Sequence, residues 1–373
     1  MNVVAEDLPE HGSGFPGPWR LAWRRLRYDR LAMVSLAVVA FFIALMALSW
    51  TGWLAADWGR EVGVSHAPPG LIGPDAASPA VQHGGAPAGG IQPDDSGVVD
   101  PLGEVLARIR SGAAGAADDG GVVDPLAGVL AEIRARAGAA QAGGAMRAAT
   151  LPFGGDKWGR DVLSKVIKGT ETSLFVGLSA ALLATFLGTV FGAFAGYHGR
   201  RVDDFLNWFY SVFTSVPYLL LILAIAAVLS QKGTVTVVLI LGLTGWTGIF
   251  RLVRAEYMKH KVREYVQAAD AIGASHARRM FVHILPNISH VVLVQLSLHV
   301  VLFIKSEVVL SFLGFGVGVD TVSWGSMLNE AQSELLLGKW WQLAAATAAM
   351  AVLVTSFSLL TDALRDALDP KLK

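Results

Sequence analysis

The stretch Thr172–Gly196 reads TSLFVGLSAALLATFLGTVFGAFAG and contains no charged residue. A run of this length and apolarity can cross the hydrocarbon core of a bilayer as a helix. Within a bilayer the backbone must satisfy its own hydrogen bonds, so a helix is the expected structure. The stretch therefore predicts a helical membrane protein.

Comparable apolar stretches occur on both sides of this one. They are Leu31–Trp50, Phe205–Leu229, Thr234–Phe250, His290–Phe312 and Trp341–Leu360. Polar connections separate them, as expected for successive membrane crossings. Together the stretches predict an all-α membrane protein with about six transmembrane helices.

The composition excludes several functional classes. Of the 373 residues, 53% are hydrophobic and 16% are charged, and the mean hydropathy is +0.49. A soluble protein of this length needs more charge on its surface. The zero net charge gives no general attraction to nucleic acid, and the absence of cysteine excludes disulfides and thiolate sites. We expect no catalytic residue and no metal site, because no nucleophile–base pair or metal-ligand spacing is present.

Basic residues predict which side of the membrane each connection occupies. An arginine-rich run precedes Leu31–Trp50, and further basic residues lie at Arg200, within 251–287 and in the C-terminal tail. Because cytoplasmic connections are enriched in Lys and Arg, both termini are predicted to be cytoplasmic, including residues 1–30. A cleaved signal peptide or a twin-arginine signal is the alternative for the N-terminal run. The long apolar run without a clean cleavage site favours a retained anchor.

Residues 51–150 form a Gly-, Ala- and Pro-rich insert, which this topology places outside the cytoplasm, in the periplasm. Such a composition cannot bury a core of its own. The insert contains an internal repeat, since Gly97–Leu102 recurs as Gly121–Leu126 and each copy continues into a similar apolar stripe. The repeat has two interpretations. It forms a docking surface for an external partner or two short helices lying on the membrane, or it is a tolerated duplication in an exposed loop. We favour the duplication, because lengthening an exposed loop costs little chain entropy.

The polar connection Arg251–Asn287 is the most informative segment. Its pattern predicts a helix that ends at Gly273, a second helix capped by Ser275, and a stop at Pro286. The end of the first helix carries small side chains, at Ala268, Ala269 and Gly273. A surface of this kind admits the groove of another protein. The alternative is an amphipathic segment lying on anionic lipid.

This segment resembles the EAA loop of binding-protein-dependent ABC importers, whose pattern is Glu-Ala-Ala-x-x-x-Gly followed by Ile-x-Leu-Pro. In that family the loop forms a coupling helix in the cleft of a separate ATPase subunit. The resemblance assigns this docking to Gln267, Ala268, Ala269, Gly273, Ala274, Leu285 and Pro286. Gln267 departs from the family's Glu, which removes a charge but keeps the shape, and His283 stands where the pattern has Ile.

Other blocks resemble the dipeptide/oligopeptide (peptide/nickel) permease family, in its second-subunit branch. They include Asp156–Ser164, Ser215–Pro217, Leu310–Gly316, Ser323–Leu328 and Leu364–Pro370. The resemblance covers Trp19–Trp50 and Leu151–Leu372, so we assign an ABC permease transmembrane domain to 151–373. It implies the type I ABC importer permease fold and a bacterial inner-membrane location.

The resemblance also implies partners. They are a second permease subunit, which completes a heterodimeric pathway, two cytoplasmic ABC ATPase subunits, an extracytoplasmic substrate-binding protein and the lipid bilayer. The solute would be a dipeptide, an oligopeptide, a peptide antibiotic, a nickel chelate or a related compound. No phosphate-binding Gly-x-x-x-x-Gly-Lys-Ser/Thr motif is present, so ATP and Mg are expected in the partner ATPases and no cofactor in this chain. The alternative is a stand-alone secondary transporter or channel, for which inverted hydropathy halves are expected but not visible.

Several residues within the apolar stretches carry further interpretations. Small residues recur on one helix face at Gly188, Gly192 and Gly196. This face indicates close helix packing, either within the chain, which we favour, or in a permease core. Pro217 is predicted to kink its helix, which would shape a pore or improve packing.

Charged and polar residues in one late stretch are also candidates. Glu307 is predicted to face the bundle interior or the pathway, or to have a purely structural hydrogen-bonding role. Lys305 lies two positions away and so does not share its helix face. Gln295 and His299 are polar candidates for the pathway, and each is more often a packing residue.

Overall fold

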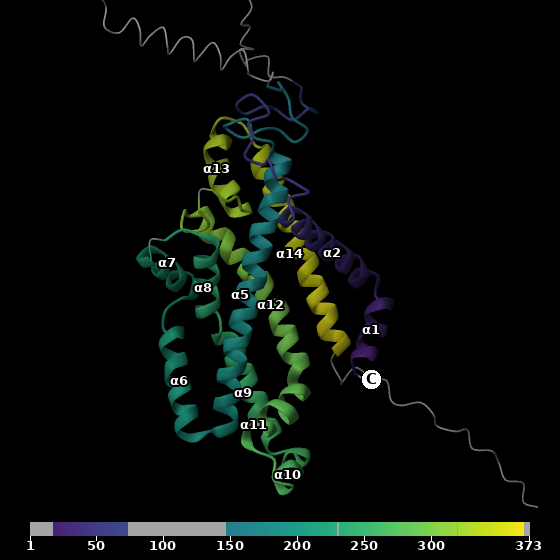
Figure 1. The fold of residues 1–373 in the computed structure, drawn as a ribbon, viewed down its shortest axis with the longest axis vertical. Helices are drawn as coiled ribbons and strands as arrows, with labels where there is room; N and C mark the ends of the chain where they lie inside the picture. Colours follow the sequence, from purple (N-terminus) through teal and green to yellow (C-terminus); the bar gives the residue numbers. More distant parts are fainter. Residues whose placement is uncertain (1–17, 74–146, 230, 319, 369–373) are drawn as a thin grey trace, which may run out of the picture. The chain divides into compact units, whose positions relative to one another are not determined.

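The computed structural model describes residues 18–73, 147–229, 231–318 and 320–368 (Figure 1). The chain forms two compact units, one from Met1–Pro74 with Ala148–Lys373 and one from Asp75–Arg147. The second unit lies outside the described residues except for Arg147, and so does the predicted repeat. The fold below is that of the first unit.

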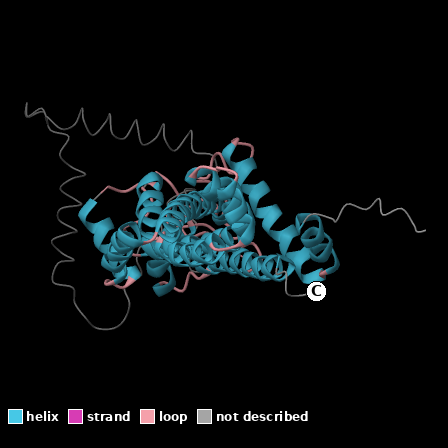
Figure 2. Ribbon diagram, turned by 90° about the horizontal axis from the view of Figure 1, so that it is seen from below, coloured by secondary structure: helices cyan, strands magenta, loops and turns pink. Residues whose placement is uncertain are grey.

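The described residues form helices, loops and isolated β-bridges, and no strand is drawn among them (Figure 2). The first helices are α1 (Pro18–Tyr28), α2 (Arg30–Trp50), α5 (Val162–His198), α6 (Arg200–Thr214), α7 (Tyr218–Leu229) and α8 (Thr234–Thr244). The remaining helices are α9 (Thr247–Lys261), α10 (Glu264–Ala271), α11 (His276–Arg278), the π-helix η1 (Arg279–Ile284), α12 (Leu285–Phe312), α13 (Trp324–Leu336) and α14 (Trp341–Leu368).

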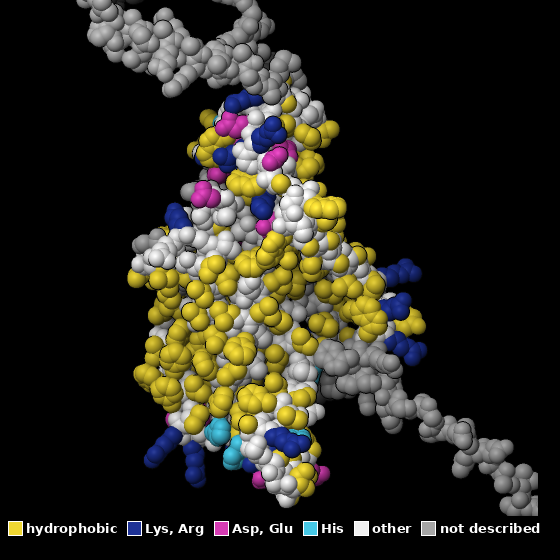
Figure 3. Space-filling view, viewed as in Figure 1, with side chains coloured by type: hydrophobic (Ala, Val, Ile, Leu, Met, Phe, Trp, Pro, Cys, Tyr) yellow, Lys and Arg dark blue, Asp and Glu magenta, His cyan; other side chains and the backbone are white. Residues whose placement is uncertain are grey.

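Five of the described helical stretches are long and apolar enough to cross a membrane. They are Arg30–Trp50, Val162–His198, Thr234–Lys261, His276–Phe312 and Trp341–Leu368. A sixth crossing exists if the bent pair of α6 and α7 is one span. The expectation of about six transmembrane helices is therefore confirmed as five or six. Figure 3 shows hydrophobic side chains covering the middle of the face on view, with charged side chains toward the ends and along the right-hand edge.

The stretch Phe205–Leu229 is not the single kinked helix that its apolarity predicts. Two helices, α6 and α7, meet at an angle of 82° across Ser215, Val216 and Pro217. Proline has no N–H to continue the hydrogen bonds of α6, and it disfavours a helical conformation in the residue before it. The carbonyl of Pro217 instead accepts the N–H of Leu221, 3.0 Å away, and so begins α7. Pro217 therefore marks a break.

The longest helix of the core is α5, which packs against α2, α8, α9 and α12. Asp161 caps its first turn and accepts the Ser164 N–H at 2.9 Å. Apolar side chains from these helices, among them Leu174, Leu241 and Phe303, are fully buried around it. The other core helices are thus held through α5.

The segments that the sequence marks as basic gather at one end of this unit. The short helix α1 packs against α14, and Arg25 lies in a hollow shared with Asp366. Arg365 of α14 and His290 of α12 line one further hollow. Helix α1 and the last described turn of α14 therefore lie on the same side as the start of α12.

The opposite end contains structure that apolarity alone does not predict. The connection after Phe312 includes the helix α13, whose first turn is closed by reciprocal hydrogen bonds between Ser323 and Ser326. Residues 51–73, counted in the predicted insert, pair through isolated bridges with the segment before α5, for example Gly63 with Ala148. Ala67 is fully buried there. The first part of the 51–150 segment is therefore packed on the helical unit.

Candidate functional site

The connection between α9 and α12 forms a compact elbow, residues 262–275, that contains α10. Gly273 has a φ of +83°, the left-handed conformation that ends α10, and Ser275 accepts the Arg278 N–H to begin α11. The predicted helix end and restart are both confirmed. In Figure 1 the elbow projects beyond the ends of α9 and α12.

One face of α10 anchors the elbow. Val266 and Ala269 are 3% and 4% exposed, and Val266 packs with Met280, Ile284 and Tyr257. The Tyr257 hydroxyl donates to the Met280 carbonyl at 3.1 Å, which ties α9 to η1. The helix α10 itself contacts both α9 and η1. The elbow is thus fixed to both long helices.

The other face of α10 is exposed. Ala268 is exposed, and Ile272, one helical turn further on, is 84% exposed. A Cβ added to Gly273 would meet nothing within 4 Å among the described residues, so open space surrounds the turn. A large apolar side chain beside small residues on a projecting elbow is typical of a docking surface. The sequence analysis did not include Ile272 among the docking residues. The available signal was a large apolar residue directly before a helix-ending glycine in an otherwise polar segment.

The predicted docking residues divide between this surface and its support. The Gln267 side chain donates to the Val262 carbonyl at 3.2 Å, so it holds the elbow's first turn. Ala274 is half-buried, and its N–H donates to the Ala269 carbonyl at 3.0 Å. Asp270 pairs with Arg279, which links α10 to η1.

Pro286 does not stop a helix, contrary to the sequence prediction. A single helical stretch runs from His276 to Phe312, and Pro286 lies in the first turn of α12. The preceding π-helix explains this, because the Leu285 N–H donates to the Met280 carbonyl, five residues back. The wider π turn relieves the clash that a proline ring makes with an α-helical turn. Leu285 is half-buried and Pro286 is exposed.

The three predicted packing glycines bring α5 against α9. They are Gly188, Gly192 and Gly196, all buried. A Cβ on Gly192 would lie 2.8 Å from the Phe250 carbonyl oxygen, and the other two glycines face the α9 backbone in the same way. Only glycine permits this approach, so the favoured interpretation of packing within the chain is confirmed.

Glu307 is enclosed within the helical unit. It is 0% exposed, and its two oxygens accept the Ser173 and Ser311 hydroxyls at 2.8 and 2.7 Å. This geometry joins α5 to α12 and favours the structural hydrogen-bonding interpretation. Lys305 is exposed on another face of α12, as the spacing predicts.

A buried ionic cluster lies at the end opposite the elbow. Its members, called here the Lys165 cluster, are Asp156, Lys165, Glu330, Glu334 and Gln342. The Lys165 ammonium, 1% exposed, donates to Asp156 at 2.9 Å, Glu330 at 2.6 Å and Gln342 at 3.3 Å. These contacts join the loop before α5 to α13 and α14. Sequence reasoning missed Lys165, which was visible as a cation in the first turn of an apolar helix.

Glu334 is the third carboxyl group of this cluster and is 1% exposed. One oxygen accepts the Lys157 N–H at 3.1 Å, and the other is buried without a partner among the described residues. Burial raises the pKa of Glu334 to about 7, and the Asp156 and Glu330 carboxylates add to this, against the lowering effects of the Lys157 N–H and Lys165. The described residues contain no group of three or more His, Cys, Asp or Glu placed for a metal ion.

Five or six stretches that are long and apolar enough to cross a membrane, with an elbow projecting past the ends of α9 and α12, define a multi-span membrane protein. Residues 188–373 match the family of binding-protein-dependent transport system inner membrane components. Residues 17–69 match the N-terminal transmembrane domain of oligopeptide transport permease C. This match extends beyond Trp50, where the resemblance seen in the sequence ended. The chain belongs to this family of inner-membrane transport components, which favours an importer subunit over a stand-alone transporter or channel.

Two curated relatives agree with this assignment. The dipeptide transport system permease protein of Bacillus subtilis is 38% identical over 221 residues, 59% of this chain and 69% of that protein. The oligopeptide transport system permease protein of the same organism is 35% identical, over 59% of this chain and 72% of that protein. A solved structure of an amino acid ABC transporter with histidines was also compared with this chain by its fold. The structural alignment covers 55% of this chain and 94% of the transporter chain, at 16% identity and a TM-score of 0.41.

Proposed function

We propose that this chain forms half of the translocation pathway for peptides or peptide-like solutes in an ATP-driven importer. The relatives named above are dipeptide and oligopeptide permeases, and they support this solute class. A second permease subunit forms the other half, and an extracytoplasmic binding protein delivers the solute. ATP and Mg bind in two separate ATPase subunits, and this chain binds neither.

The observation that carries the coupling role is the two-faced elbow. Val266 and Ala269 anchor it to α9 and η1, while Ala268 and Ile272 stay exposed. A rigid projection with an unoccupied apolar face can transmit movement from a docked ATPase to α9 and α12 as a two-state shift. The elbow and both termini then lie in the cytoplasm, as the basic residues at this end support.

Ala268→Trp tests this role. The indole fills the docking face without touching the chain's own core, because Ala268 is exposed. We expect the ATPase subunits to stop co-purifying with the permease and ATP-dependent peptide uptake to fall at least ten-fold, while membrane insertion persists. The readouts are subunit recovery after affinity purification and uptake of labelled peptide.

The matched control is Ala40→Trp, an exposed alanine on α2 at a lipid-facing depth. It should change neither readout. Normal ATPase recovery with normal uptake in the Ala268→Trp transporter would rule out docking at this face. Gly273→Trp is less decisive, because the left-handed backbone there is strained by any side chain.

A further inference from the structure

The side of α9 that faces away from α5 borders a groove of about 500 Å³. Thr247, Gly248, Arg251, Leu252 and Ala255 line this side, and Tyr210 of α6 and Gln295 of α12 form the opposite walls. The buried side of α9 is different, since Ile249, Phe250, Val253 and Tyr257 pack inside the unit. The groove therefore places two polar residues of α9, Thr247 and Arg251, beside small and apolar ones and opposite a phenol and an amide.

These positions lie within helical stretches that are long and apolar enough to cross a membrane, with Arg251 where the polar connection begins. Thr247 and Arg251 belong to the span Thr234–Lys261, and Gln295 belongs to the span His276–Phe312. A guanidinium, a phenol, an amide and a hydroxyl facing hydrocarbon together would be costly. Such side chains in a spanning bundle face water or a polar solute. The groove is thus better suited to an aqueous route than to lipid.

Arg251 differs from the arginine one turn further along α9. Arg254 is bound to Asp203 by two hydrogen bonds, one of 2.7 Å. Arg251 is exposed and contacts Tyr210, with its guanidinium 3.5 Å from the phenol oxygen and 5.9 Å from the ring centre. Within the part of the chain that the structure describes, it has no acidic partner. Apart from this long contact with Tyr210, the guanidinium on the groove has no charged partner among the described residues.

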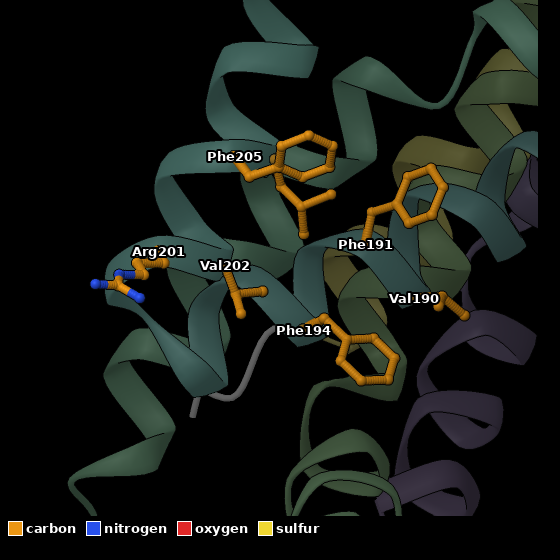
Figure 4. A pocket seen from close by; sticks show the side chains of 7 residues that line it. Val190, Phe191, Phe194, Arg201, Val202 and Phe205 are labelled. Carbon is orange, nitrogen blue, oxygen red and sulfur yellow. The ribbon is translucent and has the colours of Figure 1, made fainter.

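Another groove has a different lining. It lies between α5 and α6 and is lined by Phe191, Phe194, Val202 and Phe205, with Arg201 at its edge (Figure 4). Its walls are almost entirely apolar, so acyl chains suffice to fill it. Of the two grooves, only the one beside α9 combines a cation that lacks an acidic partner with amide- and hydroxyl-bonding groups.

We propose that the α9 groove carries the solute and that Arg251 is a subsite for the carboxylate at the C-terminus of a peptide. Arginine binds carboxylates through two parallel hydrogen bonds, and the neighbouring hydroxyl and amide groups suit the peptide backbone. This assignment rests on the proposed function and adds the chemical group that the pathway recognises. Gln295, also considered for the pathway from the sequence, lies across the groove from it.

The test uses the assembled transporter, with its ATPases and binding protein, in proteoliposomes. Uptake of trialanine is compared with uptake of its C-terminal amide, for the wild type and for Arg251→Gln. We expect Arg251→Gln to lower trialanine uptake about ten-fold while amide uptake changes less than two-fold. Any preference of the binding protein cancels, because it is the same in both transporters. Arg251→Lys should restore part of the trialanine uptake.

Lys259→Gln, an exposed cation on the same helix that pairs with Glu256, is the matched control and should leave both uptakes unchanged. Equal loss of both peptides, no loss of either, or recovery of the variant when phosphatidylglycerol is added would overturn the carboxylate subsite. Recovery with that lipid would make Arg251 a headgroup contact. A wild-type complex that transports neither peptide would overturn the proposed function as well. If the wild type transports peptide but Arg251→Gln gives one of these contrary results, only the carboxylate subsite is overturned.

Discussion

The regions beside the first and last turns of α5 differ in the side chains that they leave exposed. At its first turn, Lys165 is 1% exposed and its ammonium is shared among three oxygens from the preceding loop, α13 and α14. At its last turn, Tyr197 contacts His276 at 3.0 Å, but the elbow beyond it leaves Ile272 84% exposed. The first region buries a charge within the chain, and the second exposes a large apolar side chain.

The difference shows where a partner is needed. A buried lysine is stable only when its charge is compensated, so the Lys165 cluster must be complete within the chain. An exposed isoleucine gains nothing from the fold and is explained by a partner that covers it. Stability and coupling should therefore separate by position, and the following substitutions test that separation.

Lys165→Met should have the largest effect. It leaves Asp156 and Glu330 without their shared cation, and removal of one partner from a buried ionic group costs about 3–5 kcal/mol. We expect a large fall in thermal stability of the detergent-purified protein. Lys168→Met is the control, because that lysine is 27% exposed and pairs with Glu171, so its loss should cost less than about 1 kcal/mol. Similar losses for the two variants would contradict the cluster's role.

Glu334 should give stability a pH dependence of intermediate size. Its folded pKa, about 7, is above the ordinary value of 4.5, so the native state holds a proton that the unfolded chain releases. The protein is therefore most stable below pH 4.5 with respect to this group, and the contribution is lost as pH rises to 7, by about 3 kcal/mol at most. Thermal unfolding between pH 5 and 8 measures it. Glu334→Gln should flatten the slope, and an unchanged slope would refute the assignment.

Ile272→Ser should have the smallest effect on stability. The side chain is almost fully solvent-exposed, so its loss should change unfolding by less than about 0.5 kcal/mol. The same change should weaken ATPase recovery, since the apolar contact is lost. A marked fall in thermal stability would mean that the elbow's outer face belongs to the fold. Val266→Ser, on the buried face, should by contrast destabilise the protein.

Local signals predicted much of the elbow and of the bundle. The apolar runs located the spans, because a bilayer requires a long uninterrupted helix. Gly273 and Ser275 predicted a helix end and a helix start, because left-handed backbone and capping hydroxyls act within a few residues. The spacing of Gly188, Gly192 and Gly196 predicted close packing for the same reason. In each case the cause lies in neighbouring residues.

Features that depend on distant residues were missed. Lys165 meets Glu330 and Gln342 from 165 and 177 positions away, and no local pattern announces such contacts. The break at Pro217 and the continuation at Pro286 show that a proline's effect depends on the turns around it. Pro217 separates two helices, whereas Pro286 follows a π turn that makes room for its ring. The sequence contained both prolines but not the geometry that distinguishes them.

The π turn η1 contains one residue more per turn than α-helix would, and an α-helical residue occupies about 100° of rotation. The wider π turn absorbs this surplus residue, so deleting one residue within 279–284 would restore uniform α-helical winding with little rotation of α10 about the axis of α12. Forcing the same residues into a regular α-helix would instead turn α10 by about that angle, and Ala268 and Ile272 would then face a different direction. The π geometry therefore sets the direction in which the elbow faces relative to the membrane helices.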